Sequence, residues 1–149
     1  MALSAVRNRP GTTARRSGYV IAVLVNAGML VLVNTWPGWE AAPFLTGETR
    51  LVVGWVNLSI LVNMAANLVY LADDRVWLRA LGDVATMAVG VAALVRIWQV
   101  FPFDFSSFDW VLVARSALVL GIIGSIIGIL VACISLVRGV TTAASDQGV

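Results

Sequence analysis

Four long apolar runs constrain this chain more than any other feature of its sequence. They cover about residues 19–36, 51–71, 81–98 and 110–137. A helix needs about 20 apolar residues to cross the hydrocarbon core of a bilayer. Only helices and closed barrels satisfy their backbone polar groups there, and these runs lack the alternation of barrel strands. The sequence therefore predicts an all-α protein, an antiparallel bundle of four transmembrane helices.

The composition agrees with a membrane protein and argues against several other classes. Hydrophobic residues make up 60% of the chain and charged residues only 12%, against about 25% charged in soluble domains. The chain has no His and a single Cys, Cys133, which excludes a disulfide, a His/Cys metal site and a His-activated nucleophile. Phosphate-loop and dinucleotide motifs are also absent. We therefore predict no enzymatic activity, no cofactor and no bound metal.

The arginine residues indicate the orientation of the helices. One side of the predicted bundle carries Arg7, Arg9, Arg15, Arg16, Arg75, Arg79 and Arg138, whereas the other carries Glu40, Glu48, Arg50, Asp104 and Asp109. Cytoplasmic loops are rich in Arg and Lys. Both termini are therefore predicted to be cytoplasmic, as tails of residues 1–18 and 138–149 around a transmembrane domain of residues 19–137. The basic charge reflects this topology and not nucleic-acid binding.

All ten basic residues of the chain are arginine. This bias is typical of a GC-rich bacterial genome. It places the predicted protein in a bacterial cytoplasmic membrane, with the lipid bilayer as its first partner.

Two charged residues, Asp83 and Arg96, lie within the third apolar run. If Gly90 marks the middle, the rise of a helix puts Asp83 about 10 Å toward the inner side and Arg96 about 9 Å toward the outer side. Ionisable groups at such depths are candidates for function. Arg96 can extend to the outer surface, or it can meet Asn34, which is predicted at a similar depth, or an acid of the outer loops.

Asp83 has a structural and a functional interpretation. In the first, which we favour, it pairs with Arg79 one turn earlier, near a helix N-terminus. In the second, it binds a proton or a cation, and Asn63 and Asn67 line a polar path toward it. Asn63 and Asn67 lie four residues apart and so share one helix face. Amides in membrane helices more often hydrogen-bond neighbouring helices, with about 0.6 kcal/mol per interaction.

Small residues recur every four positions in the fourth run. Ala117, Gly121 and Ser125 form one row, and Gly124, Gly128 and Ala132 form another. Small residues at this spacing let helix backbones approach closely. Two rows predict close packing on two sides of this helix, one within the bundle and one against a second copy of the protein.

The two outer loops are rich in aromatic residues. Trp36-Pro-Gly-Trp-Glu belongs to the first loop, and Phe101-Pro-Phe-Asp-Phe belongs to the second. Tryptophan favours the headgroup region, but Phe has no polar group that would place it there. We expect these loops to fold over the outer ends of the helices or to lie in the headgroups. A docking surface for a partner is the alternative.

Four motifs resemble small four-span membrane proteins of actinobacteria. They are Trp36-Pro-Gly-Trp-Glu, Pro43-Phe-Leu-Thr, Leu81-Gly-Asp and Arg96-Ile-Trp-Gln-Val-Phe-Pro-Phe-Asp-Phe. The resemblance covers most of the chain between the first and fourth runs. It implies the four-span fold and carries no activity, cofactor or site residues.

Two functions remain at this point. The favoured one is a non-enzymatic structural or accessory membrane protein that self-associates or joins a larger membrane complex. The alternative is a small ion- or proton-coupled transporter or channel that uses Asp83. The first depends on the small residues of the fourth run, and the second on the intramembrane acid.

Overall fold

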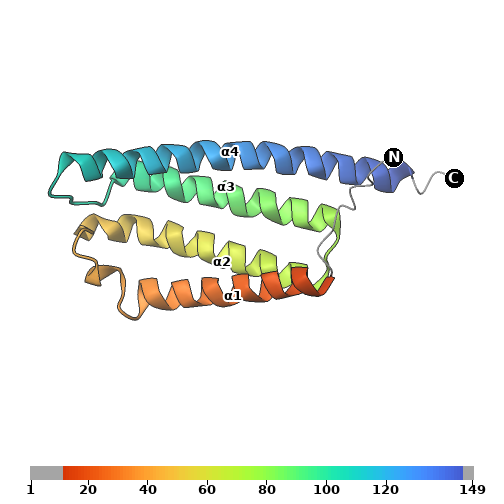
Figure 1. The fold of residues 1–149 in the computed structure, drawn as a ribbon, viewed down its shortest axis with the longest axis horizontal. Helices are drawn as coiled ribbons and strands as arrows, with labels where there is room; N and C mark the ends of the chain where they lie inside the picture. The colour runs from red at the N-terminus through yellow and green to blue at the C-terminus, as the bar shows by residue number, and fades with distance from the viewer. Residues whose placement is uncertain (1–11, 146–149) are drawn as a thin grey trace, which may run out of the picture.

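The computed structural model of the chain describes residues 12–145, and within them the side chains of residues 13–137. This part of the chain is helical throughout, apart from its loops. The elements are α1 (Thr12–Asn34), η1 (Trp39–Ala41), η2 (Gly47–Thr49), α2 (Arg50–Ala72), α3 (Val76–Val100) and α4 (Phe108–Ser145). Consecutive long helices run in opposite directions (Figure 1). The predicted all-α, four-helix antiparallel bundle is therefore confirmed.

The helices are longer than the apolar runs that predicted them. Helix α1 begins at Thr12, so Arg15 and Arg16 lie in its first turns. Helix α3 begins at Val76, and α4 continues to Ser145 beyond the predicted end at residue 137. An apolar run marks only the part of a helix that lies in hydrocarbon, whereas intrahelical hydrogen bonds also satisfy the backbone in the headgroup region. Residues 1–11 and 146–149 of the predicted tails lie outside the described part.

All four helices are long and apolar enough to cross a membrane. The mean hydropathy of their most apolar stretches runs from 1.7 to 2.8. Large apolar side chains also point outward, and Leu24 and Leu120 are 65% and 69% exposed. Water would penalise this exposure at roughly 25 cal/mol per Å² of apolar surface, but lipid tails do not. The chain is a multi-pass membrane protein.

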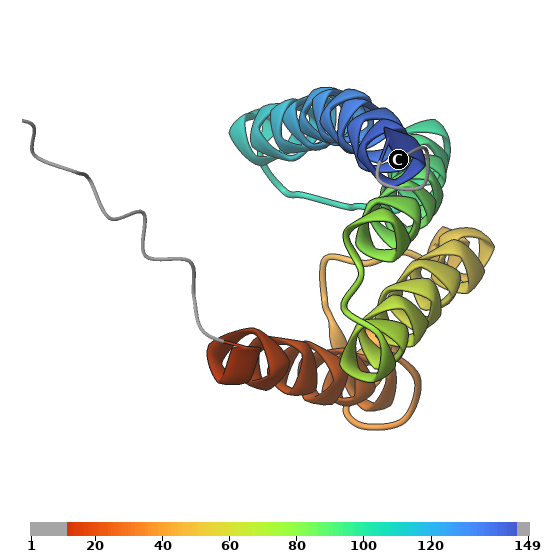
Figure 2. The same cartoon turned by 90° about the vertical axis from the view of Figure 1, so that its right-hand side faces the viewer.

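The helices form an open, curved layer. Helix α2 packs between α1 and α3, and α3 packs between α2 and α4. Seen along the helices, α1 and α4 lie at the two ends of the curve and leave a gap between them (Figure 2). The bundle is therefore open along one side. The start of α1, the α2–α3 turn and the end of α4 share one end of the layer, called the inner end here.

One face of α4 packs against α3. The residues of this face alternate spacings of three and four, as Leu118, Gly121, Ser125, Gly128 and Ala132. A Cβ atom added at Gly121 would lie 3.3 Å from Leu94 Cδ1, and one at Gly128 would lie 2.7 Å from Met87 Sδ. At both positions, side chains of α3 occupy the space that a Cβ atom on α4 would need.

The predicted division of α4 into two rows of small residues is therefore wrong. Gly121, Ser125 and Gly128 share the face toward α3, although the prediction placed Gly128 in the other row. Gly124 is exposed and has no neighbouring atom within 4 Å of an added Cβ. The reason is that the contact face of a packed helix repeats about every 3.5 residues, so rows of strict spacing four drift off it.

The two outer loops pair with each other through their backbones. Thr46 N donates a hydrogen bond to Pro102 O over 3.0 Å, and Asp104 N donates one to Phe44 O over 2.9 Å. An isolated antiparallel bridge joins Leu45 and Phe103 between them. The loops therefore fold together at the outer end of the helices, in line with the first expectation for them.

Arg115 in α4 connects the second loop to the end of α3. Its guanidinium carbon lies 4.5 Å from the ring centroid of Phe101 and 5.2 Å from that of Trp98. Phe101 ends α3 in a left-handed conformation, with φ of 44°. The guanidinium thus holds two aromatic rings at a turn whose backbone is unfavourable for a residue with a Cβ.

We predict that Arg115→Gln lowers the thermal unfolding midpoint of the protein in detergent micelles. Loss of both cation–π contacts should cost about 0.5–2 kcal/mol. Arg75→Gln is the control, because the side chain of Arg75 is 69% exposed and forms an ion pair with Asp73. An equal loss of stability in both variants would contradict the assigned role of Arg115.

Candidate functional site

The polar side chains of the inner end converge on Asp74, in the turn between α2 and α3. Tyr19 Oη donates a hydrogen bond to Asp74 Oδ1 over 2.8 Å. Arg79 Nε lies 3.2 Å from Asp74 Oδ1, and Arg15 Nε lies 3.4 Å from Oδ2. Both Nε atoms are buried, but neither donates a hydrogen bond. These two contacts are therefore ion pairs between oppositely charged groups, without the geometry of a hydrogen bond.

Tyr70 extends this group of polar residues toward Asp83. It is only 6% exposed, and its hydroxyl oxygen lies 3.0 Å from Arg79 O and 3.1 Å from Asp83 Oδ1. One hydroxyl hydrogen serves both acceptors, so the two hydrogen bonds share it. The rings of Tyr19 and Tyr70 meet edge to face with their centroids 5.5 Å apart. A continuous chain of contacts thus links α1, α2, the inner turn and α3.

We call this group the inner polar network. Its members are Arg15, Tyr19, Tyr70, Asp74, Arg79 and Asp83. Sequence reasoning did not find Tyr70 or the central position of Asp74. The related sequence feature is Gly82, since a Cβ there would collide with the Tyr70 hydroxyl, but this becomes visible only once α2 and α3 are placed side by side.

The predicted pairing of Asp83 with Arg79 is wrong. Arg79 pairs with Asp74 instead, and Asp83 accepts a hydrogen bond from Tyr70. Side chains on a helix lean toward its N-terminus. Arg79 therefore reaches back to the inner end, where Asp74 lies, and away from Asp83 in the next turn. Among the described side chains, Asp83 makes no ion pair.

Asn63 and Asn67 do share a face of α2, but they bind each other and not Asp83. Asn67 Nδ2 donates hydrogen bonds to Asn63 O over 2.8 Å and to Asn63 Oδ1 over 2.7 Å. Neither residue lines the groove at Asp83. The structure therefore does not assemble the predicted site of Asp83, Asn63 and Asn67. The amide of a side chain as short as asparagine finds hydrogen-bond partners most easily within its own helix.

Asn34 and Arg96 also have partners other than each other. Asn34 and Asn57 exchange two hydrogen bonds of 2.9 and 2.7 Å between α1 and α2. Arg96 Nη1 donates a hydrogen bond to Gln99 Oε1 over 3.3 Å. The predicted meeting of Arg96 with Asn34 is wrong, whereas the expectation that amides join neighbouring helices holds for Asn34.

Asp83 lies in a groove between α3 and α4. The groove has a volume of about 380 Å³ and is lined by Val76, Arg79, Ala80, Asp83, Met87, Gly128, Val131, Ala132 and Ser135. Its lining extends outward only to Met87 and Gly128, so it occupies the inner half of the layer. A carboxylate that lacks an ion-pair partner in such a groove can accept a proton or a cation.

No family model, no curated protein and no solved structure matches the chain. The fold thus gives the class of the protein, a multi-pass helical membrane protein. Any inference about its role has to come from the geometry of its helices and polar residues.

We predict that Gly82→Ala destabilises the protein by about 1–3 kcal/mol, the usual effect of overpacking. The added methyl group would displace the Tyr70 hydroxyl and break its hydrogen bond to Asp83. The measurement is the unfolding free energy during titration with sodium dodecyl sulfate in mixed micelles. Gly90→Ala in the same helix is the control, because an added Cβ there has open space. Gly90→Ala should leave stability unchanged or raise it by up to about 1 kcal/mol.

Proposed function

We propose that the protein is a non-enzymatic accessory protein of a bacterial cytoplasmic membrane that assembles with further copies of itself. The observation that carries the proposal is the open side of the helical layer. Helix α1 packs on α2 and helix α4 on α3, and these two end helices do not close on each other (Figure 2). Each end helix therefore has sides that no other described helix covers and that can contact a helix of a further copy.

A second face of α4 supports the self-association. Its residues repeat at spacings of three and four and are all exposed, as Val113, Ala117, Leu120, Gly124, Ile127 and Val131. Association of helices in lipid depends on close van der Waals packing, because lipid tails are as apolar as the side chains. Ala117 and Gly124 allow that approach on a face that α3 does not use.

We predict different effects for two glycine substitutions one turn apart. Gly124→Leu should reduce the oligomer in native mass spectrometry while the thermal stability of the monomer is unchanged, because Gly124 faces open space. Gly128→Leu should instead destabilise the monomer by about 1–3 kcal/mol, because Met87 already lies against this position. An oligomer that Gly124→Leu leaves intact would contradict self-association through this face.

Disulfide crosslinking in native membranes provides an independent measurement. In a Cys133→Ser background, Leu120→Cys lies on the proposed face, and Leu130→Cys lies off it at similar exposure, 59% against 69%. Oxidation should trap a dimer of the Leu120→Cys variant and not of the Leu130→Cys variant.

A second candidate function is binding of a proton or cation at Asp83 as part of transport. It is favoured by one observation, the position of the Asp83 carboxylate in the inner groove with Tyr70 as its hydrogen-bond donor. The arginine that would neutralise it in a purely structural role is engaged with Asp74. This supports a binding role for the acid in the inner half of the membrane.

We predict that protein in liposomes carries a proton or cation flux, and that Asp83→Asn abolishes it. The substitution removes the charge and keeps the shape of the side chain. Asp73→Asn is the control, because Asp73 lies outside the groove and pairs with Arg75. Absence of flux for the unmodified protein, across a panel of inorganic and organic cations, would leave assembly as the function.

A further inference from the structure

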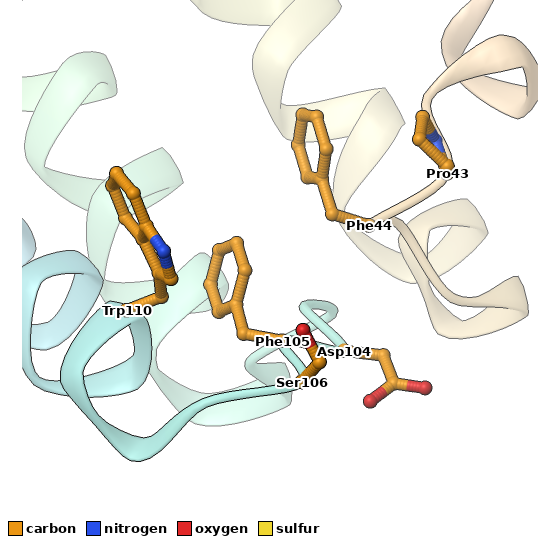
Figure 3. Close-up of a pocket in the computed structure, with 6 residues that line it drawn as sticks. All are labelled: Pro43, Phe44, Asp104, Phe105, Ser106 and Trp110. Carbon is orange, nitrogen blue, oxygen red and sulfur yellow. The ribbon is translucent and has the colours of Figure 1, made fainter.

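The outer loops and the start of α4 line an open cleft of about 610 Å³. It is lined by Pro43, Phe44, Asp104, Phe105, Ser106 and Trp110 (Figure 3). Neither assembly through α4 nor chemistry at Asp83 involves these residues, and an aromatic belt does not account for the phenylalanines. The cleft therefore still lacks a role.

Aromatic rings form the walls of the cleft. The rings of Phe44 and Phe105 are nearly parallel, with an interplanar angle of 14° and centroids 6.1 Å apart. Phe105 also stacks on Phe103 at 5.5 Å. Trp110 projects from α4 on the other side of Phe105 from Phe44 (Figure 3). The cleft therefore presents three aromatic groups from two loops and one helix.

The backbone holds these rings in position. The hydrogen bond from Asp104 N to Phe44 O joins the two ring-bearing loops directly beside the cleft. Phe103, which supports Phe105, belongs to the same isolated bridge. A site whose walls are already ordered has a smaller entropic cost of ligand binding.

The charges around the cleft favour a cation. Asp104 is exposed and, among the described side chains, makes no ion pair. The arginines of the outer end have partners outside the cleft: Arg50 pairs with Glu40, Arg96 with Gln99, and Arg115 with Trp98 and Phe101. Faces of aromatic rings carry negative potential and attract ammonium groups, which is the basis of aromatic sites for choline and methylated lysine.

We propose that this cleft binds an organic ammonium group, as found in choline and ethanolamine. The alkylated nitrogen lies between Phe105 and Trp110, and Asp104, which precedes Phe105 in the same loop, supplies the counter-charge. The Ser106 hydroxyl offers a hydrogen bond to the oxygen that follows the nitrogen in these compounds. The cleft lies at the outer membrane surface, so the ammonium group comes from a lipid headgroup or from a dissolved molecule.

The test is isothermal titration of the detergent-purified protein with choline and, separately, with 3,3-dimethylbutan-1-ol. This alcohol has the shape of choline without the charge. We expect binding of choline and much weaker binding of the alcohol. Trp110→Leu and Asp104→Asn should each weaken choline binding about three- to thirtyfold, the effect expected from one cation–π or charge contact.

Phe108→Ala is the matched control for these variants. Phe108 is an outer aromatic residue, 77% exposed, that does not line the cleft. It should leave choline binding unchanged, and circular dichroism should show equal helix content in all variants. Equal binding of choline and its neutral analogue, equal binding by all variants, or no binding of choline at all would overturn the proposal.

The source of the ammonium group follows from a second measurement on the same variants. Native mass spectrometry of protein from nanodiscs compares retention of phosphatidylcholine and phosphatidylethanolamine with that of phosphatidylglycerol. Preferential retention of the ammonium lipids, lost in Trp110→Leu and Asp104→Asn, identifies a headgroup site. Retention without preference, together with choline binding in the titration, identifies a site for a dissolved amine.

Discussion

The structure depends on one constraint, that a backbone in hydrocarbon must satisfy its own hydrogen bonds. Each apolar run meets it alone by forming a helix. The same solvent removes the force that closes a bundle in water, because lipid covers an apolar side chain as well as a neighbouring helix does. An open layer is therefore no less acceptable to these helices than a closed one. Their relative positions come from close packing and from polar contacts at the two ends.

The polar contacts differ between the two ends of the layer. At the inner end, charged groups from α1 and α3 meet at Asp74 in a turn, while Tyr70 and Asp83 continue the network into the α2–α3 interface. At the outer end the link is made by backbone pairing of two loops and by aromatic rings. Between the ends, Asn34 and Asn57 join α1 to α2, and glycines join α3 to α4. Each neighbouring pair of helices is therefore joined by a different type of contact.

The sequence was sufficient for the helices and their number, because hydropathy over about 20 residues reports directly on the solvent. It was insufficient for contacts that depend on the direction of a long side chain. The spacing of Arg79 and Asp83 is right for a pair, yet Arg79 leans toward the inner turn and meets Asp74. The small residues of α4 were recognised, but their assignment to faces failed because a spacing of four drifts around a helix.

Tyr70 is an example of a contact that could not be predicted from the sequence at all. Its role needs α2 and α3 to be placed side by side before Gly82 acquires a meaning, and a single sequence gives no such register. The pairing of the outer loops is of the same kind. Pro43-Phe44 and Pro102-Phe103 are similar in sequence, but only the fold brings the two segments together.

The pairing of the outer loops has a mechanical consequence. The α1–α2 and α3–α4 hairpins are joined covalently only by the short turn at the inner end, so the α2–α3 interface would act as a hinge if nothing else linked them. The loop bridge adds a second link at the far end of that interface, and Asp74 adds ties from α1 and α3 at the near end. Links at both ends of this interface oppose sliding of one hairpin along the other, because such a movement would break the loop hydrogen bonds or the ion pairs of Asp74. The two links therefore fix the register of the hairpins along α2 and α3, and a change in the curvature of the layer would have to be a rotation about this interface.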